Sequence, residues 1–298
     1  ELDMRRDTFL KSLAAMAAVG AFPLSAQAAA SIKMMLPANP GGGWDSTGRA
    51  FGKAMIDAKL ADNVQFENKG GAAGVIGLAQ FINSAKGDGN SMMVMGAVML
   101  GGIISSKPAA GLEKLTPLAR LTSEYNVFVV PANSPLKTMK DVADQMKKDP
   151  GSVKWGGGSK GSTEHIAASM LASRIGVDPK KVNYVPFRGG GEAVAAILGG
   201  NVTVGGSGYS EFQQYIESGK MKAIAVTSPN RVFGMDKIPT LNDLGLNVEI
   251  GNWRGVFGAA GLTPEQRDAL TQRVIKATQS KAWQDALVKN NWMPALLT

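Results

Sequence analysis

Short apolar runs along the chain alternate with longer segments in which apolar residues recur every three or four positions. The runs have the length and composition of buried strands, and the intervening segments have the spacing of one helix face. The expected strands cover residues 32–36, 64–68, 92–95, 127–130, 153–155, 182–187, 202–204 and 223–226. Because strands that alternate with helices form parallel sheets, the pattern predicts an α/β fold with ligands at the carboxyl ends of strands.

Helix starts are marked by side chains that can accept hydrogen bonds from the first backbone amides. Asp45 or Ser46 is expected to cap a helix that runs to about residue 59. A further helix is expected over residues 209–217, where Gly219 follows its end. Two capping-box pairs, each a threonine followed three residues later by an acceptor, are Thr138 with Asp141 and Thr263 with Gln266.

The alternating pattern starts again after an expected strand that ends at Pro131. The chain is therefore expected to cross into a second domain near Val130 and to return near Val226. Two crossing segments predict a hinged protein of two lobes. The expected boundaries are residues 31–129 with 229–298 for lobe 1 and residues 130–228 for lobe 2.

Two glycine-rich loops each stand between an expected strand and a helix, at residues 41–43 and 156–161. Glycine lets the main chain approach a guest closely. Ser162 and Thr163 are good caps for the helix after the second loop, whose apolar face is expected to include Ile166. A helix N-terminus attracts anions, so two such loops predict one anionic ligand held from two sides.

Composition narrows the classes of function. The 298 residues are 44% hydrophobic, enough for two domains, and carry a formal net charge of +8. Only 6% of residues are aromatic, and no basic run interleaves with them. This favours a small anionic ligand over nucleic acid. The chain has no cysteine and one histidine, His165. Disulfides and thiol catalysis are therefore excluded, and neither a metal site nor a cofactor is expected.

Residues 1–28 have the features of an export signal. Residues 4–6 give a basic start, residues 9–24 are mostly apolar, and residues 26–28 fit a small-residue cleavage site. The segment is too short for a transmembrane span, so we expect a protein that is soluble outside the cytoplasm. The paired arginines leave general secretion and twin-arginine export both open, and an amphipathic helix is the alternative interpretation.

The second glycine loop also invites a nucleotide interpretation. Gly156, Gly158 and Gly161 match the G-x-G-x-x-G spacing of dinucleotide-binding loops. The next expected strand, however, leads into Arg188 and not into the acidic residue that would bind a ribose. Lys160 precedes Gly161 and does not follow it, so the P-loop pattern fails. An exported enzyme that acts on a carboxylate or a nucleotide stays as the alternative function.

Four polar residues near glycine-rich or aromatic sequence are candidates for chemistry. His165 has no Ser or Cys nucleophile beside it, so packing or hydrogen bonding to the loop is favoured over a role as general base. Asp45 is favoured as a cap that holds loop amides. Arg188 and Arg254 suit a bidentate contact to a carboxylate, with ordinary surface arginines as an equal alternative.

Five segments of the chain together resemble one known family. They are PANPGGGWDSTGRA, ENKGGAAGVIG, GGGSKGSTEHIA, VPFRGGGEAVAAILGGNV and KAIAVTS. In this order, after an export signal, they are similar to the solute-binding proteins of tripartite tricarboxylate transporters, the Bug family. The resemblance runs from about residue 31 to the end and is strongest to the citrate-binding branch. Members of the family usually continue beyond the position of Thr298 into a last helix.

The resemblance implies a two-lobe periplasmic-binding-protein fold, type II-like, in which each lobe is a largely parallel sheet flanked by helices. The two crossing segments would form its hinge. It also implies a periplasmic protein that is not an enzyme. Such a protein captures a di- or tricarboxylate, citrate-like, and delivers it to the membrane permease subunits of the transporter. We expect a monomer that binds no nucleic acid.

The resemblance also assigns ligand-binding residues, to which the sequence context adds Arg188. In the first loop they are Gly42, Gly43 and Asp45, and in the second they are Ser159, Gly161, Ser162 and Thr163. The remaining wall is assigned to Ala97, Val98, Gly208 and Tyr209.

Overall fold

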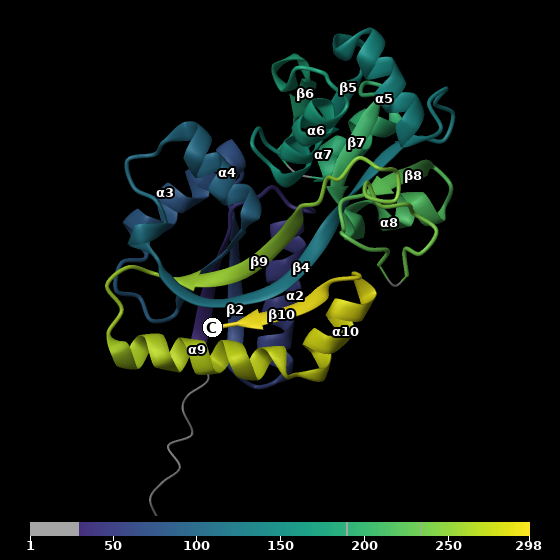
Figure 1. The fold of residues 1–298 in the computed structure, drawn as a ribbon. Helices are drawn as coiled ribbons and strands as arrows, with labels where there is room; N and C mark the ends of the chain where they lie inside the picture. The colour runs from purple at the N-terminus through teal and green to yellow at the C-terminus, as the bar shows by residue number, and fades with distance from the viewer. Residues whose placement is uncertain (1–29, 189, 233) are drawn as a thin grey trace, which may run out of the picture.

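The structure is a computed structural model that describes residues 30–188, 190–232 and 234–298. The expected export signal lies outside the described residues. The described chain forms two lobes, and the long strand β4 (Thr116–Pro131) runs from one lobe into the other (Figure 1).

The first lobe is built around a mixed sheet. Strand β1 (Ala30–Leu36) pairs in parallel with β2 (Ala61–Asn68) and with β3 (Ser91–Gly96). Strand β9 (Gly251–Gly258) runs antiparallel to β3 and to the first half of β4, and β10 (Met293–Leu297) pairs with that same half. The helices of this lobe are α2 (Gly43–Asp57), α3 (Val75–Ser84), α4 (Ala97–Ser106), α9 (Pro264–Thr278) and α10 (Lys281–Lys289).

The second lobe continues the sheet from the other half of β4. Strands β7 (Val204–Gly208) and β8 (Met221–Val226) pair antiparallel with β4. Strand β5 (Lys154–Gly157) lies parallel to β7 and to β6 (Asn183–Pro186). The expectation of largely parallel sheets is therefore wrong in detail, because β4 runs through both lobes and pairs antiparallel with its neighbours, and β9 runs antiparallel to β3 and β4 in the first lobe. The helices of this lobe are α5 (Met139–Lys148), α6 (Thr163–Arg174), α7 (Gly190–Leu198) and α8 (Tyr209–Glu217).

Each lobe has its own hydrophobic core. In the first lobe, β1 and β3 pack against α2 and α10, where the rings of Phe51 and Trp283 meet edge-on at 5.3 Å between centroids. In the second lobe, successive residues of β4 face opposite sides of the sheet. Phe128 packs against Trp155 and helices α5 and α6, whereas Val129 packs against α7 and α8. Both faces of the second sheet are thereby covered by helices.

The chain crosses between the lobes twice. Strand β4 pairs with β9 as far as Tyr125 and with β7 from Asn126 onward, which marks the first crossing. After β8, the described residues between 227 and 250 stay against the second lobe, and Leu241 belongs to its core. We therefore propose boundaries at the junction of Tyr125 and Asn126 and after residue 250, in place of the expected positions.

The helix ends follow their capping residues. The structure confirms both expected capping boxes, at the starts of α5 and α9, with the side chain and backbone of each pair bonded reciprocally. Helix α8 spans the expected residues, and Gly219 follows it with a φ of +71°. Local signals of three to four residues therefore decide where these helices begin and end.

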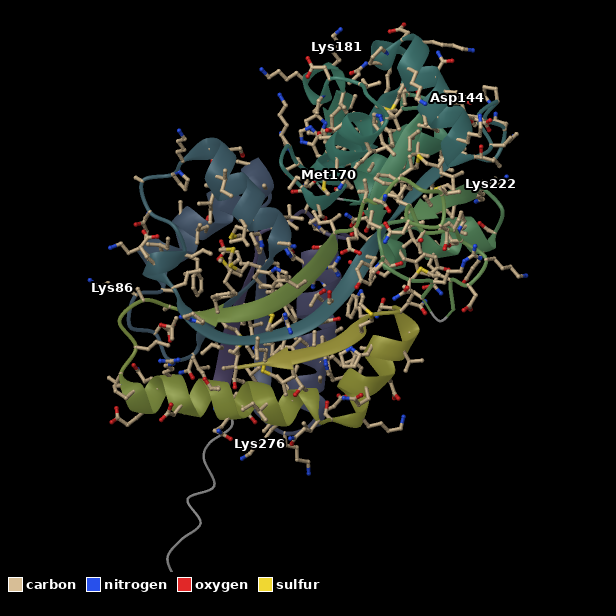
Figure 2. The ribbon with its side chains drawn as sticks, in the orientation of Figure 1. Lys86, Asp144, Met170, Lys181, Lys222 and Lys276 are labelled. Carbon is tan, nitrogen blue, oxygen red and sulfur yellow. The ribbon has the colours of Figure 1, made fainter. Side chains whose placement is uncertain are left out.

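Lysines that contribute to the positive charge lie on the outer surface of both lobes. Lys86, Lys181, Lys222 and Lys276 are exposed and point outward on different sides of the molecule (Figure 2). These lysines do not gather on one basic face of the kind that binds nucleic acid. Among the helices that the structure describes, none is both long and apolar enough to cross a bilayer.

Candidate functional site

A cavity of about 80 Å³ lies between the two lobes. In the first lobe its walls come from the start of α2, the turn before α3 and strand β9. In the second lobe they come from the segments that follow β5, β6 and β7. The cavity thus lies where the carboxyl ends of several strands meet, as the α/β pattern predicts.

The N-terminus of α2 forms one wall of the cavity. Gly42 is the N-cap of this helix, and Gly42, Gly43 and Trp44 line the cavity. The first amides of an α-helix have no partner within the helix, and the positive end of the helix dipole lies there. This wall therefore offers N–H donors to an anion.

Asp45 lies inside the first turn of α2, so the expectation that it precedes the helix as a cap is wrong. Its carboxylate accepts hydrogen bonds from the amide of Gly41 at 3.0 Å and from the amide group of Asn68 at 2.8 Å. It also pairs with Arg49 at 2.8 Å. Asp45 thus holds a loop amide from behind, as expected, but does not line the cavity. The N-cap residue, Gly42, has no side chain that could accept a hydrogen bond. The amide of Gly41 is therefore free to donate to Asp45, which lies further along the chain.

The second loop is held by the first turn of α6. Ser162 is the N-cap, as expected, and its hydroxyl accepts the amide of His165 at 3.4 Å and contacts the hydroxyl of Tyr184 at 3.1 Å. His165 Nδ1 accepts the amide of Gly161 at 2.9 Å, and its ring stacks on Tyr184 at 4.2 Å between centroids. Burial and the nearby Lys160 lower the pKa of His165. The imidazole therefore holds the loop, which is the role that the sequence favours.

Glu164 turns its carboxylate into the same loop. It accepts the amide of Gly158 and, at 3.2 Å, the hydroxyl of Thr163, and it lines the cavity. Burial raises the pKa of Glu164, while these hydrogen bonds oppose the rise. With Gly161 bonded to His165, side chains of α6 already use two loop amides, one of which, that of Gly161, was assigned to the ligand.

The two lobes touch at the rim of the cavity. The hydroxyl of Ser159 accepts the amide of Ala73 at 3.1 Å, which joins the second loop to the turn before α3. Gly101 of α4 packs directly on the carbonyl of Gly161, because a Cβ at Gly101 would lie 2.0 Å from that oxygen. The structure therefore shows the lobes closed on each other.

Arg254 of β9 lines the cavity and is 2% exposed. Its guanidinium donates hydrogen bonds to Glu124 and, at 3.1 Å, to Thr47, and it lies 5.7 Å from the ring centroid of Trp292. Glu211 of α8 lies 3.7 Å from Nη2 of Arg254. The arginine does bind carboxylates, as its sequence context suggested, but these belong to the protein itself.

Glu211 faces the cavity with a side chain that is 10% exposed. Burial raises the pKa of Glu211 to about 7, with Arg254 opposing the rise and Glu124 adding to it. Burial also raises the pKa of Glu124, against the effect of Arg254. Two carboxyl groups, those of Glu124 and Glu211, therefore share one buried guanidinium, and Glu164 acts on Glu211 as a further nearby carboxyl group.

Half of the expected ligand-binding residues line the cavity. Those that line it are Gly42, Gly43, Val98, Ser159, Arg188 and Gly208. Those that stand beside or behind its walls are Asp45, Ala97, Gly161, Ser162, Thr163 and Tyr209. Thr163, for example, is buried and accepts a hydrogen bond from Asn126 at 2.8 Å. A resemblance marks a loop correctly but does not say which of its residues face inward. A direct contact between any of these residues and a ligand stays a prediction.

Four polar residues of the site were not expected: Glu124, Glu164, Glu211 and Asn252. The sequence alone does not distinguish a glutamate that will be buried from one that will be exposed. The only signal for these residues was their position just after a strand or a loop. Asn252 precedes Arg254 by two residues on β9, a strand that the apolar pattern did not reveal. Asn252 is 6% exposed, and within the described residues its Oδ1 has no hydrogen-bond partner. Asn252 thus brings to the lining of the cavity a buried amide oxygen without a partner in the part of the chain that the structure describes.

Comparison with known proteins assigns this arrangement to a family. Residues 50–296 match the family described as tripartite tricarboxylate transporter family receptor. The chain belongs to this family. The receptor is similar to protein BugT of Bordetella pertussis (strain Tohama I), with 29% identity over 286 residues that cover 93% of this chain and 86% of BugT.

Solved structures agree with the fold of the receptor. The periplasmic binding protein BugD has a TM-score of 0.80 and 25% identity, covering 89% of this chain and 88% of BugD. MatC from Rhodopseudomonas palustris, solved with bound malate, has a TM-score of 0.80 and 22% identity, covering 92% of this chain and 91% of MatC. The expected α/β, two-lobe periplasmic-binding-protein fold is confirmed.

Proposed function

We propose that this receptor captures a small organic di- or tricarboxylate, such as citrate or malate, in the cavity between its lobes. The observation that carries the proposal is the start of α2, where Gly42, Gly43 and Trp44 face the cavity. An exposed helix N-terminus combines N–H donors with a favourable dipole and is suited to a carboxylate. Arg188, which lines the cavity from the second lobe, adds a cationic group to that of Arg254.

The size of the cavity supports a small acid. A volume of about 80 Å³ is enough for roughly five to eight water-sized guests. An acid of a few carbon atoms fits this space, whereas a nucleotide needs the lobes to be apart. The alternative, an exported enzyme that acts on a nucleotide, therefore has less support than the binding of a small acid.

We further propose that the receptor is exported by residues 1–28, acts as a periplasmic monomer and delivers its acid to the membrane permease of a tripartite tricarboxylate transporter. Membership of the receptor family supports the delivery step. Cross-linking of the purified receptor to co-expressed permease subunits, with and without the acid, tests it.

Thermal unfolding with a panel of acids tests the binding proposal. The panel contains citrate, tricarballylate, malate, succinate and adipate, with nicotinamide dinucleotides as the rival ligands. An acid present at 100 times its Kd should stabilise the native state by about 2.7 kcal/mol. For a protein of this size that corresponds to a rise in Tm of roughly 5–10 °C. The uncharged diamide of malate is the matched control and should give no shift.

Three results would contradict the proposal. A nucleotide that stabilises the protein when no acid does would favour the enzyme alternative. An equal shift with malate and with its diamide would show that the carboxylates are not what the cavity recognises. Turnover of the bound acid, followed by NMR over hours, would show that the protein is a catalyst.

A further inference from the structure

The lining of the cavity proposed for an anion is not uniformly basic, because two arginines, Arg188 and Arg254, are matched by two glutamates. Glu164 and Glu211 line it, and Glu124 lies behind them against Arg254. A ligand that brings two or three negative charges into this space meets resident carboxylates that are shielded from water. Like charges in a poorly solvated site repel strongly, so some of the charge must be neutralised when the ligand binds.

The hydrogen bonds of the three carboxyl groups show which one is free to change its charge. Glu124 accepts from Arg254 and, at 3.1 Å, from Ser210. Glu164 accepts from the amide of Gly158 and the hydroxyl of Thr163. These donors favour the ionised form of each acid.

Glu211 has weaker support. Its nearest cationic atom, Arg254 Nη2, is 3.7 Å away, beyond hydrogen-bond distance, and its other stabilising contact is the hydroxyl of Ser207. The carboxyl group is also confined, because a Cβ at Gly190 would lie 1.9 Å from Oε2 and a Cβ at Gly43 would lie 2.9 Å from Oε1. Glu211 therefore cannot turn away from an anion in the cavity.

We propose that Glu211 is protonated when an acid occupies the cavity and donates this proton in a hydrogen bond to a carboxylate oxygen of the ligand. The proton comes from the solution, and no bond of the ligand is broken. Glu211 then makes the affinity for the acid depend on proton uptake. This inference rests on the proposed function, since it needs a carboxylate in the cavity.

The surroundings of Glu211 agree with this proposal. The charged groups that face it are Arg254 from β9, Glu124 from β4, Glu164 from α6 and Arg188 at the cavity wall before α7. Burial raises its pKa to about 7 even without a ligand, and an added carboxylate raises it further. If Glu211 is half protonated in the ligand-free protein at pH 7, binding at pH 7 takes up about half a proton. Binding at pH 8 takes up close to one proton.

Calorimetric titration with malate tests the proposal, because both carboxyl groups of malate are ionised between pH 6 and pH 8. At pH 6 the titration is run in MES and in bis-Tris, and at pH 8 in HEPES and in Tris. The two buffers of each pair differ in ionisation enthalpy, so the observed heat gives the number of protons taken up. We expect uptake near zero at pH 6 and near one at pH 8, with a Kd about tenfold weaker at pH 8. Burial and the nearby Lys160 lower the pKa of His165, so its titration moves away from the pH 8 end of this range.

The variant Glu211→Gln separates this residue from the other acids. The glutamine amide can donate to the ligand without a proton, so its Kd should change less than twofold between pH 6 and pH 8, with uptake near zero. Glu217→Gln, an exposed change on the same helix, is the matched control and should keep the tenfold dependence. Circular dichroism checks that both variants are folded.

Three results would overturn the proposal. Binding of malate by the unchanged protein with no proton uptake at pH 8 would refute it while leaving the proposed function intact. A pH dependence that survives in Glu211→Gln but disappears in Glu164→Gln would place the proton on the other acid. If no acid of the panel binds at any pH, the proposed function fails and the inference fails with it.

Discussion

Asn39 Nδ2 donates a hydrogen bond of 2.8 Å to Glu192 Oε1, and this contact joins the two lobes directly. Asn39 lies in the loop before α2, and Glu192 lies in the first turn of α7. The contact exists only when the lobes are closed, because Asn39 lies on the first lobe and Glu192 on the second. Neither side chain lines the cavity, but each residue holds a wall residue by its backbone amide: the carbonyl of Asn39 accepts from Gly42 at 3.1 Å, and Glu192 Oε2 accepts from Arg188 at 3.1 Å.

The variant Asn39→Asp is predicted to favour the open arrangement. It keeps the size of the side chain but sets a carboxylate against Glu192, and exposed charge pairs of this kind are worth up to about 1 kcal/mol. We expect the Kd for the acid to weaken by about two- to fivefold at low salt and to recover at high salt. Small-angle scattering should show that the acid lowers the radius of gyration of the unchanged protein more than that of the variant.

The double variant Asn39→Asp with Glu192→Gln is the control for charge, since it restores an amide opposite a carboxylate. Recovery of both the Kd and the scattering curve is expected. A radius of gyration that does not change with saturating acid in the unchanged protein would show that the lobes do not move.

Gly161→Val is predicted to weaken binding far more than Lys160→Ala. Gly161 has a φ of +82°, and its ideal Cβ would lie 3.1 Å from the carbonyl of Gly101 in the other lobe. A branched side chain there is strained and pushes the lobes apart, and we expect at least a tenfold loss of affinity. Lys160 is exposed, so its removal should cost less than about fivefold and mainly reduce the salt dependence. If calorimetry shows the reverse order for two folded variants, side-chain charge dominates recognition.

Gly43→Ala tests the wall at the start of α2. An ideal Cβ at Gly43 would lie 2.3 Å from Arg254 Nη2 and 2.7 Å from its Cζ. The guanidinium is held by Glu124 and Thr47 and cannot withdraw cheaply, so we expect a loss of about 1–3 kcal/mol in the free energy of unfolding. Stabilisation by the acid should also be lost. Gly191→Ala is the matched control, because no atom lies within 4 Å of its Cβ, and its Tm should not fall.

Glu211 predicts how the stability of the ligand-free protein depends on pH. Its folded-state pKa of about 7 lies above the ordinary glutamate pKa of 4.5, so the folded state holds the proton more tightly than the unfolded state. The contribution of Glu211 to the free energy of unfolding is therefore fully present below about pH 4.5 and is lost as the pH rises through 7. The shift corresponds to about 3 kcal/mol. From pH 5 to pH 8, the free energy of unfolding of Glu211→Gln should rise by about this much relative to that of the unchanged protein. Urea unfolding at the two pH values measures it. If the difference in free energy of unfolding between the two proteins is the same at pH 5 and at pH 8, the raised pKa of Glu211 is ruled out.

Local elements of this chain could be predicted because their signals act over a few neighbouring residues. The capping box of Thr138 and Asp141 marks the start of α5, and Tyr209–Glu217 forms α8 as its spacing predicts. Strand β4 was predicted only over residues 127–130, because its first half mixes charged and polar side chains with apolar ones. Ile166, expected on the buried face of α6, is 38% exposed. The buried face of α6 is formed largely by alanines, whose periodicity is weak.

By itself the sequence determined the two glycine loops, the order of strands and helices and the family. Each of these depends on residues that are neighbours along the chain. Only the tertiary structure decided the chemistry of the cavity. Glu124 and Arg254 are 130 positions apart, and the strands that bring them together pair through backbone hydrogen bonds that do not depend on either side chain. Whether a carboxylate is buried, and hence whether it holds a proton, depends on what packs around it from other elements. That environment exists only once both lobes have folded and closed.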